Sequence, residues 1–484
     1  VAAARWKLGQ IRPGDTVRFV PVTPAAADEL RGSDRLRAQP TVSPGSVRTT
    51  GDDGVLATSG VRRGTPSGDR PEVVYLRGGD DNVLVEYGER TLDLGLRMRV
   101  HALSEALLAL GLAGLVDVTP GVRSLHLHVD PDVLPVARLV GILQDLEEDL
   151  PATADLRVPS RRIHLPLSWD DPSIQEAVSR YAAGVRPEAP WLPSNIEFIR
   201  RINGLDTVED VRQAVFDAEY LVLGLGDVYL GAPLAVPLDP RHRLVTTKYN
   251  PARTWTPSDA VGLGGKYLCV YGMESPGGYQ LVGRTVPIWS GHRQRGVFEQ
   301  GKPWLLRFFD RVVWHPVSPE ELIEQRADFA AGRLDVEVDD ETFGLREHLD
   351  FLAENAGSIE AFTARQDVAF AAERAAWAAS GELDRGSEGE APGPSTGTGA
   401  ADGTLDVDVP DGHHVVHAPM VASVWRLEVE VDQVVEQGDP LLVLEAMKLE
   451  LRVTATGAGR VARLLVEPGR LVGPGTPLVL VADA

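Results

Sequence analysis

One lysine near the carboxy-terminal end of the chain stands out for its chemistry. Lys448 lies in the stretch LVLEAMKLELRV, at positions 442–453, where apolar and polar residues alternate as they do in strands that bury one face. Its side chain ends in a primary amine, which can form an amide with a carboxylic acid. At the tip of a hairpin this amine would be exposed to a modifying enzyme, so Lys448 is a candidate for covalent modification.

The sequence around Lys448 is an internal repeat. A shift of 37 residues aligns two halves of this region without a gap. The matched pairs include Val424 with Val461, Leu427 with Leu464, Gly438 with Gly475 and Pro440 with Pro477. Two similar all-β halves predict a small flattened barrel with quasi-twofold symmetry. Lys448 falls between the halves.

With the motif Ala446-Met447-Lys448, this module resembles the biotinyl domain of biotin carboxyl carriers. The resemblance implies covalent biotin on Lys448, attached by a biotin protein ligase that recognises Ala446 and Met447. Leu449 stands where methionine is commoner. The alternatives are an ordinary surface lysine and a lipoyl domain. Met447 argues against the lipoyl domain.

The composition describes a globular protein of about three folded units in 484 residues. A net charge of -22 argues against binding to nucleic acid or to an anionic membrane. The sequence contains no long apolar run and no signal peptide at its start, so we expect a cytoplasmic protein. The single cysteine, Cys269, lies in an apolar run and is expected to be a buried structural thiol.

Two stretches rich in glycine, proline and serine, 23–71 and 380–403, predict linkers. Between them, helical and strand patterns alternate at first, and many short strands follow from about residue 220 to 317. Residues 318–379 predict a helical tail that begins with the Ser-x-x-Glu capping pattern at Ser318. Residues 404–484 are the repeated module.

A carrier of carboxyl groups needs an ATP-dependent partner, and the sequence contains no phosphate loop for one. The candidate Gly-Leu-Gly-Gly-Lys at 262–266 lacks the Walker spacing, and a strand rather than a helix follows it. We therefore expect a turn there. ATP and Mg would be used by a biotin carboxylase outside this sequence.

The body resembles the allophanate hydrolase subunit 1 family, which is also named after 5-oxoprolinase, in the form found in urea carboxylase. The motifs that carry the resemblance are DVTPGVRSLHLHVDP, PSNIEFIRRINGL, KYNPARTWTPSDAVGLGGKYLCVYGMESPGGYQLVGRT and GKPWLLRFFDRV. It implies an α+β fold: an α+β subdomain, a cyclophilin-like β-barrel subdomain within 72–317, the helical tail, and a small all-β biotinyl domain. Residues 1–22 resemble the end of the subunit 2 domain.

The resemblance implies a ligase that moves carboxyl from N-carboxybiotin to urea and gives allophanate. We expect this sequence to be inactive without a biotin carboxylase and a subunit 2-like carboxyltransferase domain. Three alternatives remain: a guanidine-type carboxylase, a hydrolase of the 5-oxoprolinase or allophanate hydrolase type, and a non-catalytic interaction protein. The covalent carrier argues against the last two, because neither uses biotin.

Urea nitrogen is a poor nucleophile because its lone pair is delocalised, so such a site needs an acceptor or base for the NH2 group. Asp227 and Asn250 are the candidates for that role. Arg253 and Lys302 are candidates to hold the carboxylate or the ureido oxygen of biotin. Alternatively, Asp227 is a turn residue, and Lys302 is a turn lysine beside Pro303.

The turn at Gly277-Gly278 lets the backbone approach a ligand closely, so these glycines and Tyr279 are candidates for substrate binding. Arg284, which follows them, is a further catalytic candidate. Arg253 and Arg284 are equally interpretable as ion-pair partners within a barrel.

The histidine groups do not predict a metal site, because neither has acidic or cysteine partners at a recognisable spacing. The groups are His126 with His128, and His413, His414 and His417.

Overall fold

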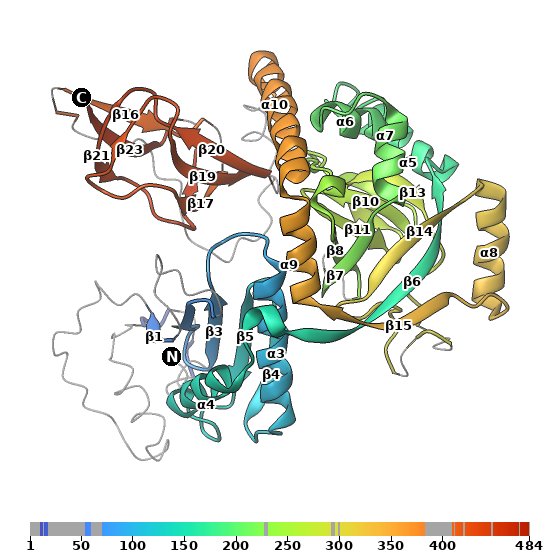
Figure 1. The fold of residues 1–484 in the computed structure, drawn as a ribbon, viewed down its shortest axis with the longest axis horizontal. Coiled ribbons are helices and arrows are strands. Elements are labelled where there is room, and N and C mark those ends of the chain that lie inside the picture. Colours follow the sequence, from blue (N-terminus) through green and yellow to red (C-terminus); the bar gives the residue numbers. More distant parts are fainter. Residues whose placement is uncertain are drawn as a thin grey trace. The chain divides into compact units, whose positions relative to one another are not determined.

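The protein is described by a computed structural model that covers residues 10–12, 14–17, 54–59, 70–226, 231–291, 296–298, 301–382, 409–410, 412–419, 422–446, 449–473 and 475–483. We describe an amino-terminal unit, a barrel body and a carboxy-terminal module one at a time (Figure 1). Two predicted segments lie largely outside the described residues: the subunit 2 remnant at 1–22 and the linker at 380–403.

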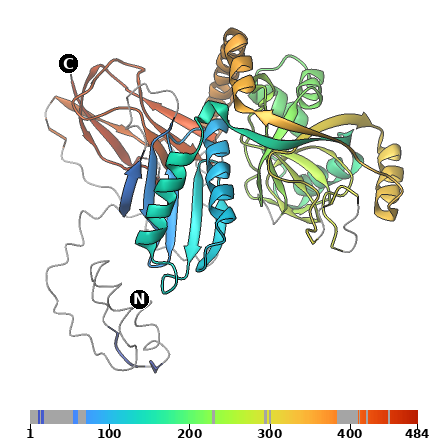
Figure 2. The ribbon, with the colours of Figure 1, turned by 60° about the horizontal axis from the view of Figure 1, so that its bottom comes forward.

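The amino-terminal unit is an antiparallel sheet with two helices (Figure 2). Its strands run in the order β1-β2-β3-β5-β4. The elements are β1 (Val55–Ser59), β2 (Val73–Arg77), β3 (Asn82–Tyr87), α3 (Leu94–Ala109), β4 (Leu115–Pro120), β5 (Ser124–Val129) and α4 (Val136–Asp149). Every second residue of β3 and β5 is buried, and these residues share one core with both helices. This alternation is the reason why the sheet has one covered face.

Strand β1 lies inside segment 23–71, for which composition predicts a linker. Its short apolar run pairs with β2 in antiparallel register. A five-residue strand on an existing sheet needs few apolar residues, so linker composition around it hides its signal.

The barrel body is a sheet that closes on itself. Seven strands follow in the order β13-β10-β11-β8-β7-β14-β6, and β13 pairs with β6 to complete the ring. They are β6 (Arg157–Trp169), β7 (Glu219–Leu225), β8 (Pro233–Pro237), β10 (Ala260–Gly264), β11 (Tyr267–Tyr271), β13 (Gln280–Arg284) and β14 (Arg311–Val317). A small sheet joins β9 (Arg253–Thr256) to β12 (Ser275–Gly277). Cys269 on β11 is fully buried, as predicted.

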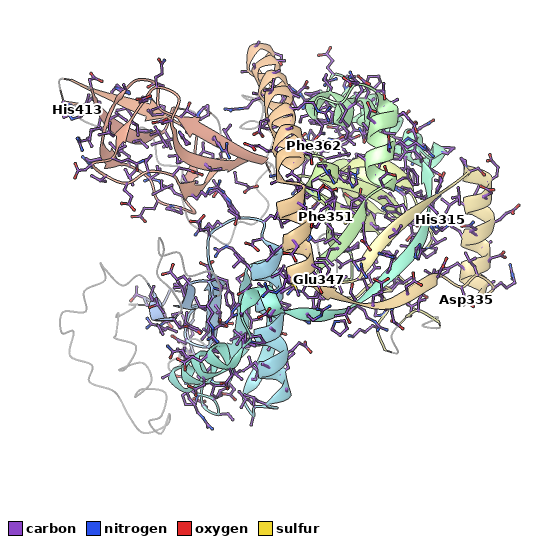
Figure 3. The ribbon with its side chains drawn as sticks, in the orientation of Figure 1. His315, Asp335, Glu347, Phe351, Phe362 and His413 are labelled. Carbon is purple, nitrogen blue, oxygen red and sulfur yellow. The ribbon has the colours of Figure 1, made fainter. Side chains whose placement is uncertain are left out.

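Helices lie around this barrel. They are α5 (Pro172–Gly184), α6 (Asn195–Ile202), α7 (Val208–Phe216), α8 (Pro319–Ala331), α9 (Leu345–Glu354) and α10 (Ala356–Ser380). The predicted capping box at Ser318 is confirmed, because its side chain and that of Glu321 bind each other's backbone N–H. Phe362 of α10 packs against the barrel core, and Arg241 lies 5.9 Å from the ring centroid of Phe351 (Figure 3).

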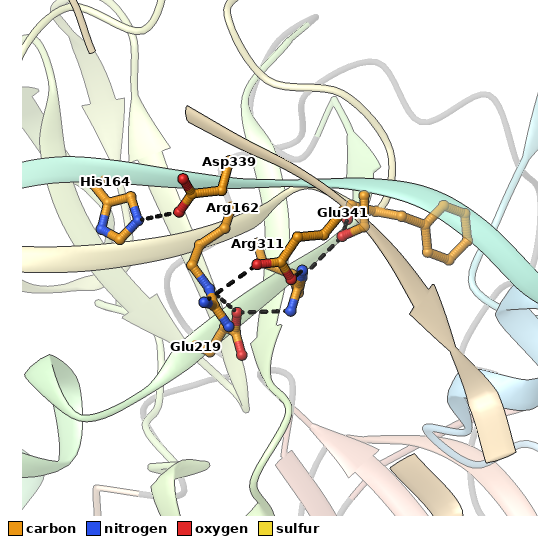
Figure 4. Close-up of polar contacts among 8 residues, drawn as sticks. Arg162, His164, Glu219, Arg311, Asp339 and Glu341 are labelled. Carbon is orange, nitrogen blue, oxygen red and sulfur yellow. Dashed lines mark hydrogen bonds and ion pairs between the residues drawn. The ribbon is translucent and has the colours of Figure 1, made fainter. Parts of the chain in front are cut away.

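A ring of alternating charges fastens strand β15 (Glu337–Gly344) to the barrel (Figure 4). Glu219 on β7 lies 2.9 Å from Arg162 on β6 and 3.0 Å from Arg311 on β14. Glu341 on β15 also pairs with both arginines. Each carboxylate thus bridges the same two guanidinium groups, and β15 is tied to three neighbouring strands.

The carboxy-terminal module consists of two four-stranded sheets, β16-β23-β21-β18 and β20-β19-β17-β22. Its strands are β16 (His413–His417), β17 (Ala422–Leu427), β18 (Val434–Val435), β19 (Pro440–Ala446), β20 (Leu449–Thr454), β21 (Gly459–Leu464), β22 (Leu471–Val472) and β23 (Pro477–Asp483). The predicted repeat is confirmed: β17, β18 and β19 correspond to β21, β22 and β23 at the expected shift. The buried residues of its core all come from the module, which therefore has the means to fold alone.

Among the described residues, no helix is long and apolar enough to cross a membrane.

Candidate functional site

The candidate site of the body lies where two segments of the barrel run side by side. The backbone N–H of Tyr249 donates to the carbonyl of Gly278 at 2.6 Å. A few residues further on, Arg253 of β9 pairs with Gly277 of β12. The structure thus brings together Asn250, Arg253, Gly277, Gly278 and Tyr279 from the predicted set.

Arg253 is the buried cation of this site, with 1% of its surface exposed. Its Nη1 donates to the carbonyl of Tyr279 at 2.6 Å, and Nη2 donates to Oγ1 of Thr256 at 3.3 Å. The guanidinium carbon lies 4.3 Å from the ring centroid of Tyr249, a cation–π contact. In the part of the chain that the structure describes, Nε has no hydrogen-bond partner and no carboxylate pairs with Arg253. Burial of an unpaired cation is costly, which makes this residue a candidate for binding an anion or a polar ligand.

Two further buried polar groups lie on the same pair of segments, and the sequence analysis missed both. Gln280 donates from Nε2 to the carbonyl of Thr247 at 3.0 Å. Both residues are fully buried, and within the described residues Oε1 of Gln280 and Oγ1 of Thr247 have no partner. The site therefore combines an unsatisfied donor on Arg253 with unsatisfied oxygens on its neighbours.

A buried amide fixes the position of Tyr249. Asn195, the first residue of α6, binds the Tyr249 hydroxyl through both atoms of its amide, at 2.6 and 2.9 Å. The same amide oxygen accepts the backbone N–H of Leu281 at 2.9 Å. Burial raises the pKa of Tyr249, so its hydroxyl stays protonated at neutral pH. Asn195 thus ties α6 to both segments of the site.

The glycines of the Gly-Leu-Gly-Gly-Lys motif make room for Tyr279. A Cβ on Gly264 would lie 2.3 Å from the ring of Tyr279, and one on Gly262 would lie 3.0 Å from its Cβ. Both glycines belong to β10, Gly265 adopts a φ of 63°, and β11 follows. The prediction of a turn at the end of the motif is confirmed, and the packing of Tyr279 explains its first two glycines.

Gly277 is required by its neighbours. A Cβ there would lie 2.6 Å from Oγ1 of Thr256 and 2.7 Å from Cε1 of Tyr271. The close approach that the sequence predicts is therefore made by side chains of the barrel itself. Gly278 is different, because its added Cβ would meet only Lys248 at an ordinary 3.5 Å.

Arg284 lies at the opposite end of β13 from Tyr279 and joins a different cluster. Its Nε donates to the carbonyl of Ser258 at 2.9 Å. Arg326 of α8 also binds the Ser258 hydroxyl, and it pairs with buried Asp259 at 2.9 Å. Burial, and then the charge of Arg326, lower the pKa of Arg284. The structure therefore does not bring Arg284 to Arg253.

The remaining two catalytic candidates do not join the cluster around Arg253. Lys302 is exposed, in a segment where the backbone of Pro303 binds Ser290, and no contact with Arg253 is described. Asp227 lies outside the described residues, in the connection from β7 to β8.

The carrier hairpin is formed by β19 and β20. Their register pairs Glu445 with Glu450 and Ala446 with Leu449, which leaves Met447 and Lys448 as the connection. Met447 and Lys448 lie outside the described residues, as does the side chain of Ala446. A two-residue connection between paired strands fits an attachment lysine, because such a turn stands clear of both sheets.

No group of three or more histidine, cysteine, aspartate or glutamate side chains within the described ranges could hold a metal ion.

Comparisons with known proteins agree with this division. Residues 73–298 match the family model described as carboxyltransferase domain, subdomain C and D. Residues 394–481 match the model described as biotin-requiring enzyme. Over 65 residues the module is 37% identical to the biotin carboxyl carrier protein of Streptococcus mutans, which covers 13% of this chain and 50% of that protein. The class is therefore a carboxyltransferase domain joined to a biotin carrier module.

Full-length relatives narrow the class. The chain is 36% identical over 479 residues to the urea amidolyase of Lachancea kluyveri, covering 98% of this chain and 25% of that protein. The crystal structure of the Kluyveromyces lactis urea carboxylase is similar with a TM-score of 0.59 at 33% identity, covering 99% of this chain and 41% of that one. The chain is a homologue of the carboxyltransferase and carrier region of urea carboxylases and urea amidolyases, and it spans about a quarter of the amidolyase.

Proposed function

We propose that this chain transfers a carboxyl group from its own biotin carrier to urea. The observation that carries the proposal is the presence of a carboxyltransferase domain and a biotin carrier module in one chain that aligns throughout with urea carboxylase and urea amidolyase. The closed barrel would be the cyclophilin-like subdomain that the sequence predicts.

Lys448 would hold the biotin as an amide, with Ala446 and Met447 as the residues that a biotin protein ligase recognises. When bound, biotin supplies a carboxyl group on a ureido nitrogen: its C–N bond breaks as a new C–N bond forms to urea, and the urea proton passes to the released nitrogen. The described register of β19 and β20 fits this role, because Lys448 belongs to the two-residue connection of the hairpin.

Arg253 would hold the negative charge that moves during the transfer. Its Nε is free for a ligand within the described part, while Nη1 and Nη2 are fixed by Tyr279 and Thr256. A guanidinium held in this way is already oriented before a ligand arrives, and preorganised donors stabilise developing charge best. Lys302, Arg284, Gly277, Gly278 and Tyr279 remain further proposed contacts of the site.

Urea needs acceptors for its N–H groups. Oε1 of Gln280 and Oγ1 of Thr247 lack partners in the described structure, and Asn250 lies on the adjoining loop. These oxygens would orient one urea nitrogen and polarise its N–H bonds. Asp227, on the connection from β7 to β8, is the proposed base that accepts the proton during transfer.

The charge of the cluster favours urea over guanidine as the acceptor. Guanidine is a cation at neutral pH and would need a carboxylate beside it. Among the described residues, the cluster around Arg253 offers a cation and neutral oxygens only. A neutral acceptor such as urea avoids the repulsion that guanidinium would meet.

Other parts of the reaction would come from partners. A biotin carboxylase domain, using ATP and Mg, would load the carrier, and a subunit 2-like carboxyltransferase domain would complete the acceptor site. The relatives' greater length supports such partners, since this chain covers only part of them.

The test combines a biotin blot with an acceptor assay. Purified wild-type chain, co-expressed with a biotin protein ligase, should bind streptavidin, and Lys448→Arg should not. With a purified biotin carboxylase added, urea should stimulate ATP hydrolysis and guanidine should not. Lys266→Arg, at an exposed lysine of the barrel body, serves as the matched lysine control for the blot. An unlabelled wild-type chain would refute the proposal, and so would stimulation by guanidine alone.

A further inference from the structure

Arg186 connects the candidate site with the end of helix α10. It follows α5, and its side chain is 11% exposed. Nη1 donates to the backbone carbonyl of Asn250 at 2.9 Å. Nη2 forms an ion pair with Glu382, whose side chain is 13% exposed. One guanidinium therefore binds both the loop that leads to Arg253 and the residue that follows the cap of α10.

The loop is held at a second carbonyl as well. The Tyr181 hydroxyl donates to the carbonyl of Pro251 at 3.0 Å. Burial raises the pKa of Tyr181 to about 12, so this hydroxyl keeps its proton at neutral pH. Both donors come from α5 and the residues just after it, so this part of the chain determines where the Asn250 backbone lies.

Aromatic contacts join the same residues to Arg253. Arg186 lies 5.5 Å from the ring centroid of Trp191, and Trp191 lies 5.1 Å from Tyr249. Tyr249 in turn carries Arg253 on its face. A continuous set of packed groups thus runs from Glu382 to the buried cation of the site.

Helix α10 ends at a fixed place on the body, where it contacts α6 (Figure 1). Gln366 donates to Oδ1 of Asn203 at 2.7 Å, and Glu373 pairs with Arg201 at 2.7 Å. The backbone N–H of Glu382 donates to the carbonyl of Trp377 at 2.9 Å. The three buried side chains of α10 are Gln366, Glu373 and Trp377, and they lie on one face at spacings of seven and four residues. Glu382 is therefore positioned by the helix as well as by Arg186.

We propose that Arg186 is a positioning residue for the acceptor site and that Glu382, where the segment leading to the carrier begins, is its counter-ion. The proposal rests on the proposed function, because Asn250 is one of the groups assigned to urea. Arg186 holds the Asn250 backbone, and Glu382 neutralises a guanidinium that would otherwise be buried without a carboxylate. The acceptor loop and the start of the tether thus depend on a single ion pair.

Charge reversal separates this role from a merely stabilising one. The double variant Arg186→Glu with Glu382→Arg restores an ion pair, but a carboxylate at position 186 cannot donate to the Asn250 carbonyl. We expect its melting temperature to recover relative to the single variant Arg186→Glu. We expect its KM for urea in the reconstituted enzyme to stay raised by about tenfold or more, because a misplaced contact residue is not restored.

Conservative variants keep the test informative should the reversed pair fail to fold. Arg186→Lys can keep a charge beside Glu382 but cannot fork to both partners, so KM for urea should rise while kcat changes less. Amide hydrogen exchange at 248–253 should become faster in Arg186→Lys. Glu360→Gln removes an exposed charge from the same helix that forms no ion pair in the described structure, and it should change nothing.

The outcomes are distinguishable from failure of the proposed function. A wild-type enzyme without urea-dependent turnover would refute the proposed function alone, and hydrogen exchange at 248–253 would still decide whether Arg186 holds the loop. Unchanged exchange and KM in Arg186→Lys would overturn the inference. Recovery of KM together with stability in the double variant would also overturn it.

Discussion

The guanidinium of Arg253 stacks on the ring of Tyr249 at 4.3 Å, and within the described residues it is balanced by no carboxylate. A buried charge without a counter-ion lowers stability unless its surroundings compensate for it. Here a carbonyl, a hydroxyl and an aromatic face compensate in part, and Nε remains free in the described structure. This arrangement suits a ligand that brings negative charge.

Replacing Arg253 should reduce carboxyl transfer strongly. Arg253→Lys keeps the charge but cannot bind Tyr279 and Thr256 while also presenting a third donor, so we expect kcat/KM for urea to fall roughly 100-fold or more. Steady-state kinetics of the reconstituted enzyme would measure this. Arg180→Lys is the matched control, because Arg180 also stacks on an aromatic ring, that of Trp255, but is 59% exposed. Equal losses in both variants would contradict the role of Arg253.

Gly277 and Gly278 should respond oppositely to the same small change. Gly277→Ala places a methyl group 2.6 Å from Oγ1 of Thr256, so the unfolding free energy should fall by about 1–3 kcal/mol. Gly278→Ala meets only Lys248 at 3.5 Å and should cost little. Chemical denaturation of both variants measures the difference. Similar losses at the two positions would show that the packing against Thr256 and Tyr271 does not matter.

The amino-terminal unit should depend on one buried ion pair. Glu147 accepts from Nε of fully buried Arg99 at 2.6 Å and from the Tyr87 hydroxyl at 2.8 Å. Glu147→Gln leaves the guanidinium without its charge partner, and we expect a loss of about 3–5 kcal/mol in this unit. Glu148→Gln, one residue further and exposed, should be neutral. Hydrogen exchange in β3 and α3 would localise the effect, and protection equal to wild type would disprove it.

Acid should destabilise the same unit through His101. Burial, and then the charge of Arg97, lower the pKa of His101 from its ordinary 6.5 to about 4. The unfolded chain therefore binds a proton that the folded unit refuses, and stability falls as the pH drops from about 6.5 towards 4. His101→Asn should flatten this part of the pH profile of unfolding. His126→Asn, at an exposed position of β5, controls for loss of a histidine. An unchanged slope in His101→Asn would contradict the assignment.

The carrier module was the part most open to prediction from sequence, and the body's site was the least. The 37-residue repeat carries strand boundaries directly, since β17 and β21 begin and end at matched positions. The bond from the Leu281 backbone to Asn195 crosses 86 residues, and no local pattern indicates it. Gln280 and Thr247 look like ordinary strand residues until the two segments are seen side by side.

Arg284 illustrates a different limit. It follows Tyr279 closely in sequence, and this suggests one shared site. An extended strand separates residues by about 3.3 Å each, so five residues of β13 place the two roughly 16 Å apart. Proximity in sequence therefore predicted proximity in space at Gly277 and Tyr279, but not at Arg284.

Transfer of label from the chain to urea tests the central claim most directly. The chain would be loaded with carbon-14 bicarbonate by a biotin carboxylase and ATP, separated from both, and mixed with urea. The account predicts that label leaves the wild-type chain in a urea-derived acid within one turnover, and that Lys448→Arg takes up no label. Label that stays on the chain with urea, or that moves to guanidine instead, would contradict it.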